Sequence, residues 1–367
     1  MTPDFWSGRR VFLTGHTGFK GGWLALWLAE LGARVSGYAL APPTTPNLFT
    51  VARVAEGLAE DQRGDIRDAP ALVRALGNAA PEIVFHLAAQ PLVRASYAQP
   101  VETYATNVMG TVHLLEAVRQ TPSVRAVIVV TSDKCYDNQE WVWGYRETDG
   151  LGGFDPYSSS KGCAEIVTAA WRRSFFAVPA AAAIASARAG NVIGGGDWAE
   201  DRLIPDAIRA FRAATPVAIR NPGAIRPWQH VLEPLSGYLC LAERLLNDGS
   251  SPDGHGGKSW AEAWNFGPLP DSEQTVAHII SRLVTLWDVP GTRAAWRHED
   301  GGHHPHEAGY LALDSAKARR RLHWAPRWNL DQALEATVSW FAAWHQGADM
   351  RALTLEQIAA YTGNSSD

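Results

Sequence analysis

Residues 11–21 read Val11-Phe12-Leu13-Thr14-Gly15-His16-Thr17-Gly18-Phe19-Lys20-Gly21. The apolar run at the start is typical of a buried strand, and residues 23–31 place apolar side chains at helical spacing. Gly15, Gly18 and Gly21 allow a tight turn, close approach of the backbone to a pyrophosphate, and close packing of helix on strand. The helix N-terminus adds free N–H groups for phosphate. This strand, turn and helix therefore predict a dinucleotide-binding site.

Apolar runs of strand length alternate with helical patterns through the first half of the chain. Strands are expected at residues 11–13, 35–40, 83–88, 127–130 and 180–186. A long amphipathic helix is expected at residues 101–119. This alternation predicts an α/β fold with a doubly wound parallel sheet of the Rossmann type, in which ligands lie at the carboxyl ends of the strands.

The second half of the chain is more irregular, and glycine clusters appear after Gly190. We expect a dinucleotide-binding domain over residues 1–185. A smaller α/β substrate lobe, interleaved with that domain, is expected over residues 186–355. The last residues, 356–367, are polar at their end and are expected to form a frayed tail.

Charge and composition narrow the functional classes. The 38 acidic and 33 basic residues give a net charge of −5, which argues against non-specific binding to nucleic acid. No apolar run approaches the roughly 20 residues of a membrane span, and no secretory signal is visible. The three cysteines match neither a disulfide framework nor a zinc pattern. We expect a reduced, cytoplasmic protein that binds neither nucleic acid nor membrane.

Tyr157 and Lys161 lie four residues apart, so they share one face of an expected helix. A free tyrosine has a pKa of about 10, and a neighbouring ammonium together with a positively charged nicotinamide favours its phenolate. Lowering that pKa by about three units takes roughly 4 kcal/mol. Such a phenolate takes the proton from an alcohol while a hydride leaves for the cofactor. Tyr157 is thus the expected base of an oxidation step.

The strand expected at residues 127–130 leads into Thr131-Ser132-Asp133-Lys134-Cys135-Tyr136. Asp133 and Lys134 form a possible acid–base pair at the carboxyl end of that strand. An enzyme that only oxidises an alcohol does not need such a pair. A dehydratase does, because it removes one proton from carbon and delivers another to a leaving hydroxyl. A structural salt bridge or a solvated turn is the alternative explanation.

Three stretches together resemble the nucleotide-sugar 4,6-dehydratases of the extended short-chain dehydrogenase/reductase superfamily, and within them the branch that acts on CDP-glucose. The stretches are residues 15–21, residues 131–136 and Ile225-Arg226-Pro227-Trp228-Gln229-His230-Val231-Leu232-Glu233-Pro234. The resemblance runs over nearly the whole chain. The related dTDP-glucose enzymes carry Asp-Glu where this chain has Asp133-Lys134, so this position favours the CDP-glucose branch.

The resemblance implies a reaction in which Ser132 hydrogen-bonds the reacting hydroxyl and Tyr157 deprotonates the C4 hydroxyl of glucose. Asp133 is then the acid for loss of water across C5 and C6, and hydride return gives CDP-4-keto-6-deoxyglucose. Lys134 is either the base at C5 or a group that orients Asp133 or stabilises the enolate. Asp133, Lys134, Ser132, Tyr157 and Lys161 are the expected catalytic residues.

NAD is the cofactor that the resemblance implies. The second expected strand ends Tyr38-Ala39-Leu40-Ala41, with no acid for the adenosine ribose, so this position does not distinguish NAD from NADP. The basic side chains of His16 and Lys20 would favour the extra phosphate of NADP. The expected cofactor-binding residues are Gly15, His16, Thr17, Gly18, Phe19, Lys20, Gly21, Asp65, Ile66, Leu87, Ala88, Ala89, Tyr157 and Lys161.

The substrate of this branch carries two phosphates, for which guanidinium groups are well-matched donors. Arg188 and Arg226 are therefore the leading expected phosphate ligands. His303, His304 and His306 lack supporting ligands, so no metal is expected. The expected substrate-binding residues are Gln90, Arg188, Asn191, Arg202, Arg226, Trp228, Arg293, His306 and Tyr310.

Two helices, at residues 101–119 and 161–176, resemble those that pair subunits in this superfamily. A homodimer is expected, with a tetramer left open, although the same apolar faces would also pack inside one chain. The alternative functions are another nucleotide-sugar 4,6-dehydratase, a UDP-sugar 4-epimerase, or a non-catalytic dinucleotide-sensing protein. Asp133 and Lys134 argue against simple epimerisation, and the intact set of Ser132, Tyr157 and Lys161 argues against a sensor.

Overall fold

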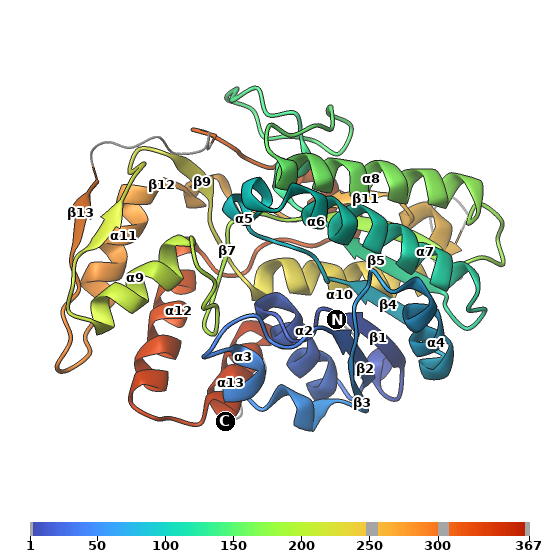
Figure 1. The fold of residues 1–367 in the computed structure, drawn as a ribbon, viewed down its shortest axis with the longest axis horizontal. Helices are drawn as coiled ribbons and strands as arrows, with labels where there is room; N and C mark the ends of the chain where they lie inside the picture. Colours follow the sequence, from blue (N-terminus) through green and yellow to red (C-terminus); the bar gives the residue numbers. More distant parts are fainter. Residues whose placement is uncertain (1–2, 247–255, 300–307, 364–367) are drawn as a thin grey trace.

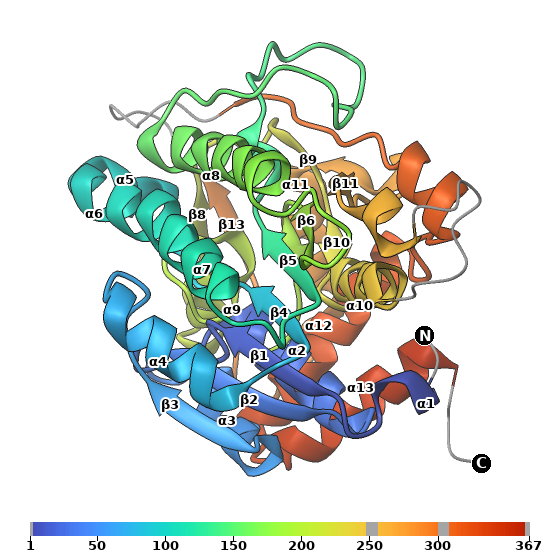
Figure 2. The same ribbon diagram turned by 90° about the vertical axis from the view of Figure 1, so that its right-hand side faces the viewer.

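The computed structural model describes residues 3–246, 256–299 and 308–363. Within them, seven parallel strands form one central sheet in the order β11-β6-β5-β4-β1-β2-β3 (Figures 1 and 2). The chain adds β2 and β3 on one side of β1, and then β4, β5, β6 and β11 on the other. This change of side is the doubly wound pattern, so the predicted fold class is confirmed. The strands are β1 Arg10–Thr14, β2 Arg34–Ala39, β3 Glu60–Arg63, β4 Ile83–His86, β5 Ala126–Val130, β6 Ala183–Arg188 and β11 Ala263–Asn265.

Helices cover both faces of this sheet (Figure 2). Successive side chains of a strand point to opposite faces, and in β5 Val127 and Val129 pack toward α4, α7 and α8 while Ile128 packs toward α2 and α10. Because β5 is buried on both sides, all five of its residues are apolar. The helices named here are α2 Phe19–Glu30, α4 Ala69–Ala79, α7 Gly110–Arg119, α8 Pro156–Ser174 and α10 Leu232–Leu246.

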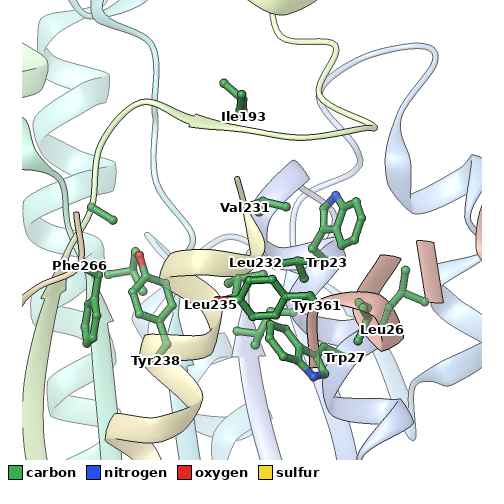
Figure 3. Close-up of a cluster of buried hydrophobic side chains, with 14 of the residues drawn as sticks. Trp23, Leu26, Trp27, Ile193, Val231, Leu232, Leu235, Tyr238, Phe266 and Tyr361 are labelled. Atoms are coloured by element: carbon green, nitrogen blue, oxygen red, sulfur yellow. The ribbon is translucent and has the colours of Figure 1, made fainter. Parts of the chain in front are cut away.

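The contact between α2 and α10 is filled by large side chains (Figure 3). Trp23 and Trp27 lie fully buried on α2, and the Trp27 ring packs edge-on against Tyr361 at 5.7 Å. Tyr361 belongs to α13 Met350–Thr362, which packs on α2. The tail expected from residue 356 is therefore wrong as far as the described chain extends, because Ile358 and Tyr361 are buried in the core.

A smaller lobe is built from the later half of the chain (Figure 1). Its elements pair in short two-stranded sheets, yet β11 returns to the central sheet and pairs with β6. The boundary expected between residues 185 and 186 thus falls inside β6. The remaining elements are α1 Pro3–Trp6, α3 Leu48–Val51, α5 Val93–Ala98, α6 Pro100–Tyr104, β7 Val192–Ile193, α9 Leu203–Arg212, β8 Val217–Ile219, β9 Ile225–Pro227, β10 Gln229–His230, β12 Glu273–Thr275, α11 Val276–Leu286, β13 Trp296–His298 and α12 Leu330–His345.

The helix expected at residues 101–119 is helical throughout but not regular. A π-helical turn over Ala105–Met109 separates α6 from α7. Such turns are frequent at functional sites. Here the turn carries Asn107, whose side chain donates to the Gln90 carbonyl oxygen at 3.0 Å and to Ser160 Oγ at 2.9 Å. The irregular turn therefore joins the segment after β4 to α8.

His230 makes the stability of the fold depend on pH. Its ring is fully buried between Trp23 and Trp328, and burial lowers its pKa from 6.5 to about 3. The unfolded chain binds a proton below about pH 6.5, whereas the folded chain does so only near pH 3, so stability is lost as the pH falls between these values. The fall of the pKa from 6.5 to about 3 corresponds to about 5 kcal/mol.

We expect His230→Phe to flatten the fall in melting temperature between about pH 6.5 and pH 4. The measurement is the slope of melting temperature against pH, because the substitution also removes the acceptor for Leu232 N–H and changes stability at every pH. His345→Gln, at the exposed end of α12, is the matched control. A His230→Phe slope equal to that of the wild type would contradict the prediction.

Candidate active site

The glycine turn between β1 and α2 is closely packed against the end of β4. Gly15 has φ +79°, and a Cβ there would lie 2.7 Å from the Ala88 nitrogen. A Cβ on Gly21 would lie 2.1 Å from the Gly15 carbonyl oxygen. Gly18 is the N-cap of α2 and brings no capping side chain. The turn therefore presents bare backbone at a helix N-terminus, which fits the pyrophosphate of a dinucleotide.

The end of β4 is tied to the end of β1 by hydrogen bonds. Thr14 Oγ1 accepts from the N–H groups of Leu87 at 3.1 Å and Ala88 at 3.2 Å, and it lies 2.8 Å from His86 Nδ1. Burial lowers the pKa of His86 to about 3, so this ring is neutral. The segment 87–89 is thus held beside the glycine turn, where the sequence predicts passage of the cofactor.

His16 does not offer a free cation to an extra phosphate. Its ring is fully buried, and a Cβ on Gly37 would lie 2.6 Å from it. His16 Nε2 lies 2.8 Å from Asp61 Oδ1 of β3, and burial lowers the pKa of His16. Thr17 Oγ1 donates to the Leu40 carbonyl oxygen at 3.0 Å. The side chains of His16 and Thr17 therefore brace the turn against β2 and β3.

Asp65 and Ile66 follow β3 at the same edge of the sheet. The Asp65 carboxylate accepts from Arg67 through its backbone and its guanidinium, which holds the pKa of Asp65 below its usual range. Ile66 is buried, and a Cβ on Gly110 would lie 2.5 Å from its side chain. The Asp65 carboxylate is therefore already engaged by the protein at this position.

Ser132, Asp133 and Lys134 form a short turn directly after β5. Ser132 Oγ accepts from Lys134 N–H at 3.2 Å and donates to Asp133 Oδ1 at 2.9 Å. Asp133 is buried, and its Oδ2 has no hydrogen-bond partner among the described residues. A Cβ on Gly190 would lie 1.7 Å from that oxygen, so only a glycine fits beside the carboxylate. Asp133 therefore presents one buried oxygen that remains available to a ligand.

Tyr157 and Lys161 lie on the first turns of α8, facing this turn. Burial raises the pKa of Tyr157 to about 12, while a hydrogen bond with Ser132 and the charge of Arg202 lower it. Lys161 Nζ donates to the Val130 carbonyl oxygen at 3.4 Å, and burial lowers its pKa to about 8. Arg202, which the sequence analysis assigned to the substrate, is thus a second cation that favours the phenolate, besides the expected Lys161.

Lys20 extends from the first turn of α2 toward these catalytic candidates. Its ammonium lies 6.0 Å from the centre of the Tyr238 ring. Burial lowers its pKa to about 7, and the charges of Arg202 and Lys161 lower it further, against the charge of Asp133. Lys20 follows the glycine turn in sequence, and its charge also interacts with those of Lys161 and Asp133.

The guanidinium of Arg188 is bonded to other side chains of the protein. It is buried and donates to Glu165 at 2.8 Å and to the Tyr136 hydroxyl at 2.7 Å. We therefore do not include it among the proposed phosphate ligands. Arg202 pairs with Asp197 at 2.7 Å and stays partly exposed. Arg226 directs its guanidinium at the backbone carbonyls of residues 225, 308 and 309.

The other expected substrate residues are dispersed around the same edge and the lobe. Gln90 is held by Thr103 and Leu92, and Asn191 has a left-handed backbone with a buried amide nitrogen that lacks a partner among the described residues. Trp228 is buried and donates to the Gln274 carbonyl oxygen. The Tyr310 hydroxyl donates to Glu273, whereas Arg293 is exposed. His303, His304 and His306 lie outside the described residues.

Glu165 is the residue of this region that the sequence analysis missed. It is buried on α8 and bonds Thr131, Ser186 and Arg188. A signal was present, because Tyr157, Lys161 and Glu165 recur every four residues and so lie along one helix face. A carboxylate on the face that carries two catalytic candidates is unlike a solvated helix position.

The GDP-mannose 4,6 dehydratase family model matches residues 12–249. The chain belongs to this family. It is 56% identical to the CDP-glucose 4,6-dehydratase of Salmonella typhimurium (strain LT2), over 98% of each chain. It is 27% identical to the dTDP-glucose 4,6-dehydratase of Xanthomonas campestris pv. campestris, over 95% of this chain and 98% of that one. The predicted membership of the nucleotide-sugar 4,6-dehydratases is thereby confirmed.

Solved structures of related proteins share the fold. MoeE5 in complex with UDP-glucose and NAD superimposes with a TM-score of 0.72 at 27% identity, covering 90% of this chain and 97% of that one. No helix in the described ranges is long and apolar enough to cross a membrane. The part of the chain that the structure describes also contains no group of three or more His, Cys, Asp or Glu side chains arranged to hold a metal.

The glycine turn between β1 and α2 gives a testable prediction for the binding of NAD. Gly21→Ala places a methyl group against the Gly15 carbonyl, so the turn must open and binding of NAD is expected to weaken at least about tenfold. Gly77→Ala is the matched control, because nothing lies within 4 Å of its Cβ and the helix α4 is expected to gain about 0.5–1 kcal/mol. Titration of NAD by fluorescence measures both. Equal affinity for NAD in the two variants would contradict the assignment of the glycine turn as the pyrophosphate site.

Proposed function

We propose that the chain converts CDP-D-glucose to CDP-4-keto-6-deoxy-D-glucose as an NAD-dependent hydro-lyase. The observation that carries this is the 56% identity over 98% of each chain to a CDP-glucose 4,6-dehydratase. It is supported by Ser132, Asp133, Lys134, Tyr157 and Lys161, which gather at one edge of the sheet. These are the groups that oxidation at C4 followed by elimination requires.

NAD is the proposed cofactor, since related proteins such as MoeE5 bind it and the backbone turn at Gly15, Gly18 and Gly21 fits a pyrophosphate. Residues 87–89, with Asp65 and Ile66, complete the proposed cofactor site. When bound, NAD supplies hydride acceptance at C4 and hydride return at C6.

The residues of the chain supply the proton transfers. Tyr157 takes the proton of the C4 hydroxyl, to which Ser132 is hydrogen-bonded. The resulting C4 ketone acidifies the proton at C5. Asp133 delivers a proton to the C6 hydroxyl, which leaves as water. Lys134 accepts the C5 proton and returns it to C5 as hydride is delivered to C6. In its alternative role Lys134 orients Asp133, which then itself carries the C5 proton to the leaving hydroxyl, and solvent protonates C5 as hydride arrives. Arg202 and Arg226 are the proposed phosphate ligands.

Comparing turnover of CDP-, dTDP- and UDP-glucose tests the substrate. We expect kcat/KM for CDP-glucose to exceed the other two at least about tenfold. The product is followed by the alkali-dependent absorbance of a 4-keto sugar. Interconversion of C4 epimers without formation of that ketone would replace the proposal with a UDP-sugar 4-epimerase. NAD binding without any turnover would favour a dinucleotide-sensing protein.

We also propose a cytoplasmic location, which suits the free cysteines.

A homodimer formed through α6, α7 and α8 is a further part of the proposal. Val101 on α6, Met109 in the π-helical turn that precedes α7, and Ile166 on α8 are 81%, 47% and 57% exposed. Exposed apolar patches mark interaction surfaces. Light scattering is expected to give a dimer, or a tetramer built from it. Ile166→Glu is expected to yield monomers, unlike the control Leu269→Glu in the lobe. A monomeric wild-type chain would exclude the dimer.

A further inference from the structure

We propose that the buried pair Glu165–Arg188 is a positioning device that clamps both ends of the catalytic turn at residues 131–136 onto α8 and β6. This inference rests on the proposed function for its catalytic consequence, but the clamp itself is a matter of geometry. Both side chains are 3% exposed, and Arg188 Nη2 lies 2.8 Å from Glu165 Oε2.

Glu165 holds the first residue of the turn. Its Oε1 accepts from Thr131 Oγ1 at 2.5 Å, and Thr131 directly precedes Ser132. Its Oε2 accepts from Ser186 Oγ of β6 at 2.7 Å. Glu165 lies two helical turns after Tyr157 on α8. The carboxylate therefore links the start of the catalytic turn to the helix that carries the proposed base.

Arg188 holds the last residue of the turn. Its Nη1 donates to the Tyr136 hydroxyl at 2.7 Å, and its guanidinium lies 4.9 Å from the centre of the Tyr136 ring. The same nitrogen lies 3.3 Å from the Glu147 carbonyl oxygen, and the Tyr136 hydroxyl donates to Asn265 of β11 at 2.8 Å. Ser132, Asp133 and Lys134 thus lie between two fixed points.

A role in positioning explains this pair better than a role in stability. Replacing a buried ion pair with apolar groups is often neutral for stability, because desolvation of the charges offsets their attraction. A forked guanidinium and a carboxylate that together bond four neighbouring groups instead define the relative placement of α8, β5 and β6. Misplacing a reacting group by about 1 Å costs up to about 100-fold in rate, so this placement matters for turnover.

Glu165 also acts on Lys161 through its charge. The charged and titratable groups that face Lys161 are Cys135 from the turn, Glu165 from α8, Lys20 from α2 and His86 from β4. Cys135 and Glu165 raise the pKa of Lys161 against the effect of burial. Neutralising Glu165 therefore lowers the pH at which Lys161 loses its proton, and the alkaline limb of the activity profile moves to lower pH.

Three variants and one control separate the possibilities. Arg188→Lys keeps the charge but removes the fork to Tyr136. Glu165→Gln tests the effect on Lys161, and the double variant Glu165→Gln with Arg188→Met removes both charges and so avoids leaving one buried charge unpaired. Arg172→Lys is the matched control, because Arg172 also joins α8 to β6, through the Ile184 carbonyl at 2.7 Å, without touching the turn.

Labelling of Cys135 reports the clamp without any assay of activity. Cys135 lies inside the turn and is fully buried. Mass spectrometry of the peptide distinguishes it from the other cysteines after brief exposure to a maleimide. In Arg188→Lys and in the double variant, Cys135 is expected to be labelled at least about tenfold faster, because the turn opens more often. The melting temperature is expected to stay unchanged, since this opening is local and not global unfolding. The control is expected to label at the wild-type rate.

Kinetics then connect the clamp to the reaction. We expect Arg188→Lys to lower kcat about 10- to 100-fold with little change in KM, and Glu165→Gln to shift the alkaline limb to lower pH. A folded double variant with wild-type labelling, wild-type kcat and an unmoved pH profile would overturn the inference. If the wild-type chain turns over no nucleotide sugar, the proposed function fails, while the labelling experiment still decides the clamp.

Discussion

Replacing Tyr157 with Phe is expected to reduce turnover of CDP-glucose by about two decades or more while NAD binding is retained. The phenyl ring keeps the packing of this buried side chain at the start of α8, but it lacks the oxygen that we propose accepts the C4 proton. Burial holds the phenol pKa at about 12 in the free chain. Ser132, Arg202 and a positively charged nicotinamide oppose that effect and favour the phenolate when the site is filled.

The pH dependence of the wild type follows from the same assignment. A base must be deprotonated to act, so kcat/KM is expected to rise with pH until the phenol has ionised, and Tyr157→Phe is expected to abolish that rise. The control is Tyr104→Phe on α6, whose hydroxyl bonds only to Ser159 among the described residues. Turnover of Tyr157→Phe within about tenfold of the wild type, with the rise intact, would remove Tyr157 as the base.

The sequence predicted those parts of the fold that are determined locally. The strands β1, β2, β4 and β5 lie where they were expected. Strands covered by helices on both faces are rich in apolar residues, so short apolar runs predict them. β3 was missed because it lies at the edge of the sheet and its four residues, Glu60–Arg63, are all polar. β11 was missed because three residues carry no periodicity, and its position depends on pairing with β6.

The same distinction holds for the candidate site. Residues directly after a strand, such as Ser132 and Asp133, were predictable because parallel strands end at one edge of the sheet. Arg188 was assigned to phosphate from residue type alone, whereas its partner Glu165 approaches only through tertiary packing. The surroundings of Lys20 were unpredictable for the same reason, since Lys161, Asp133 and Arg202 lie far from it in sequence.

Asp133→Asn is expected to separate the two halves of the reaction. The amide has nearly the shape of the carboxylate and still accepts from Ser132, so the groups around Tyr157 stay in place. It has no carboxyl proton to deliver to the leaving C6 hydroxyl. Formation of the 4-keto-6-deoxy product is therefore expected to fall at least about 100-fold, while oxidation at C4 proceeds. Stopped-flow absorbance of reduced nicotinamide, with product assay in alkali, measures both steps.

The surroundings of Asp133 make this variant informative. Its Oδ2 is buried without a partner among the described residues, and the space beside it at position 190 admits only a glycine. Asp137→Asn is the matched control, because it lies four residues further along the same segment and is exposed. If Asp133→Asn forms product at the wild-type rate, the acid is another group, and Lys134 becomes the next residue to replace. If it loses C4 oxidation as well, Asp133 acts before elimination, in the step assigned to Tyr157.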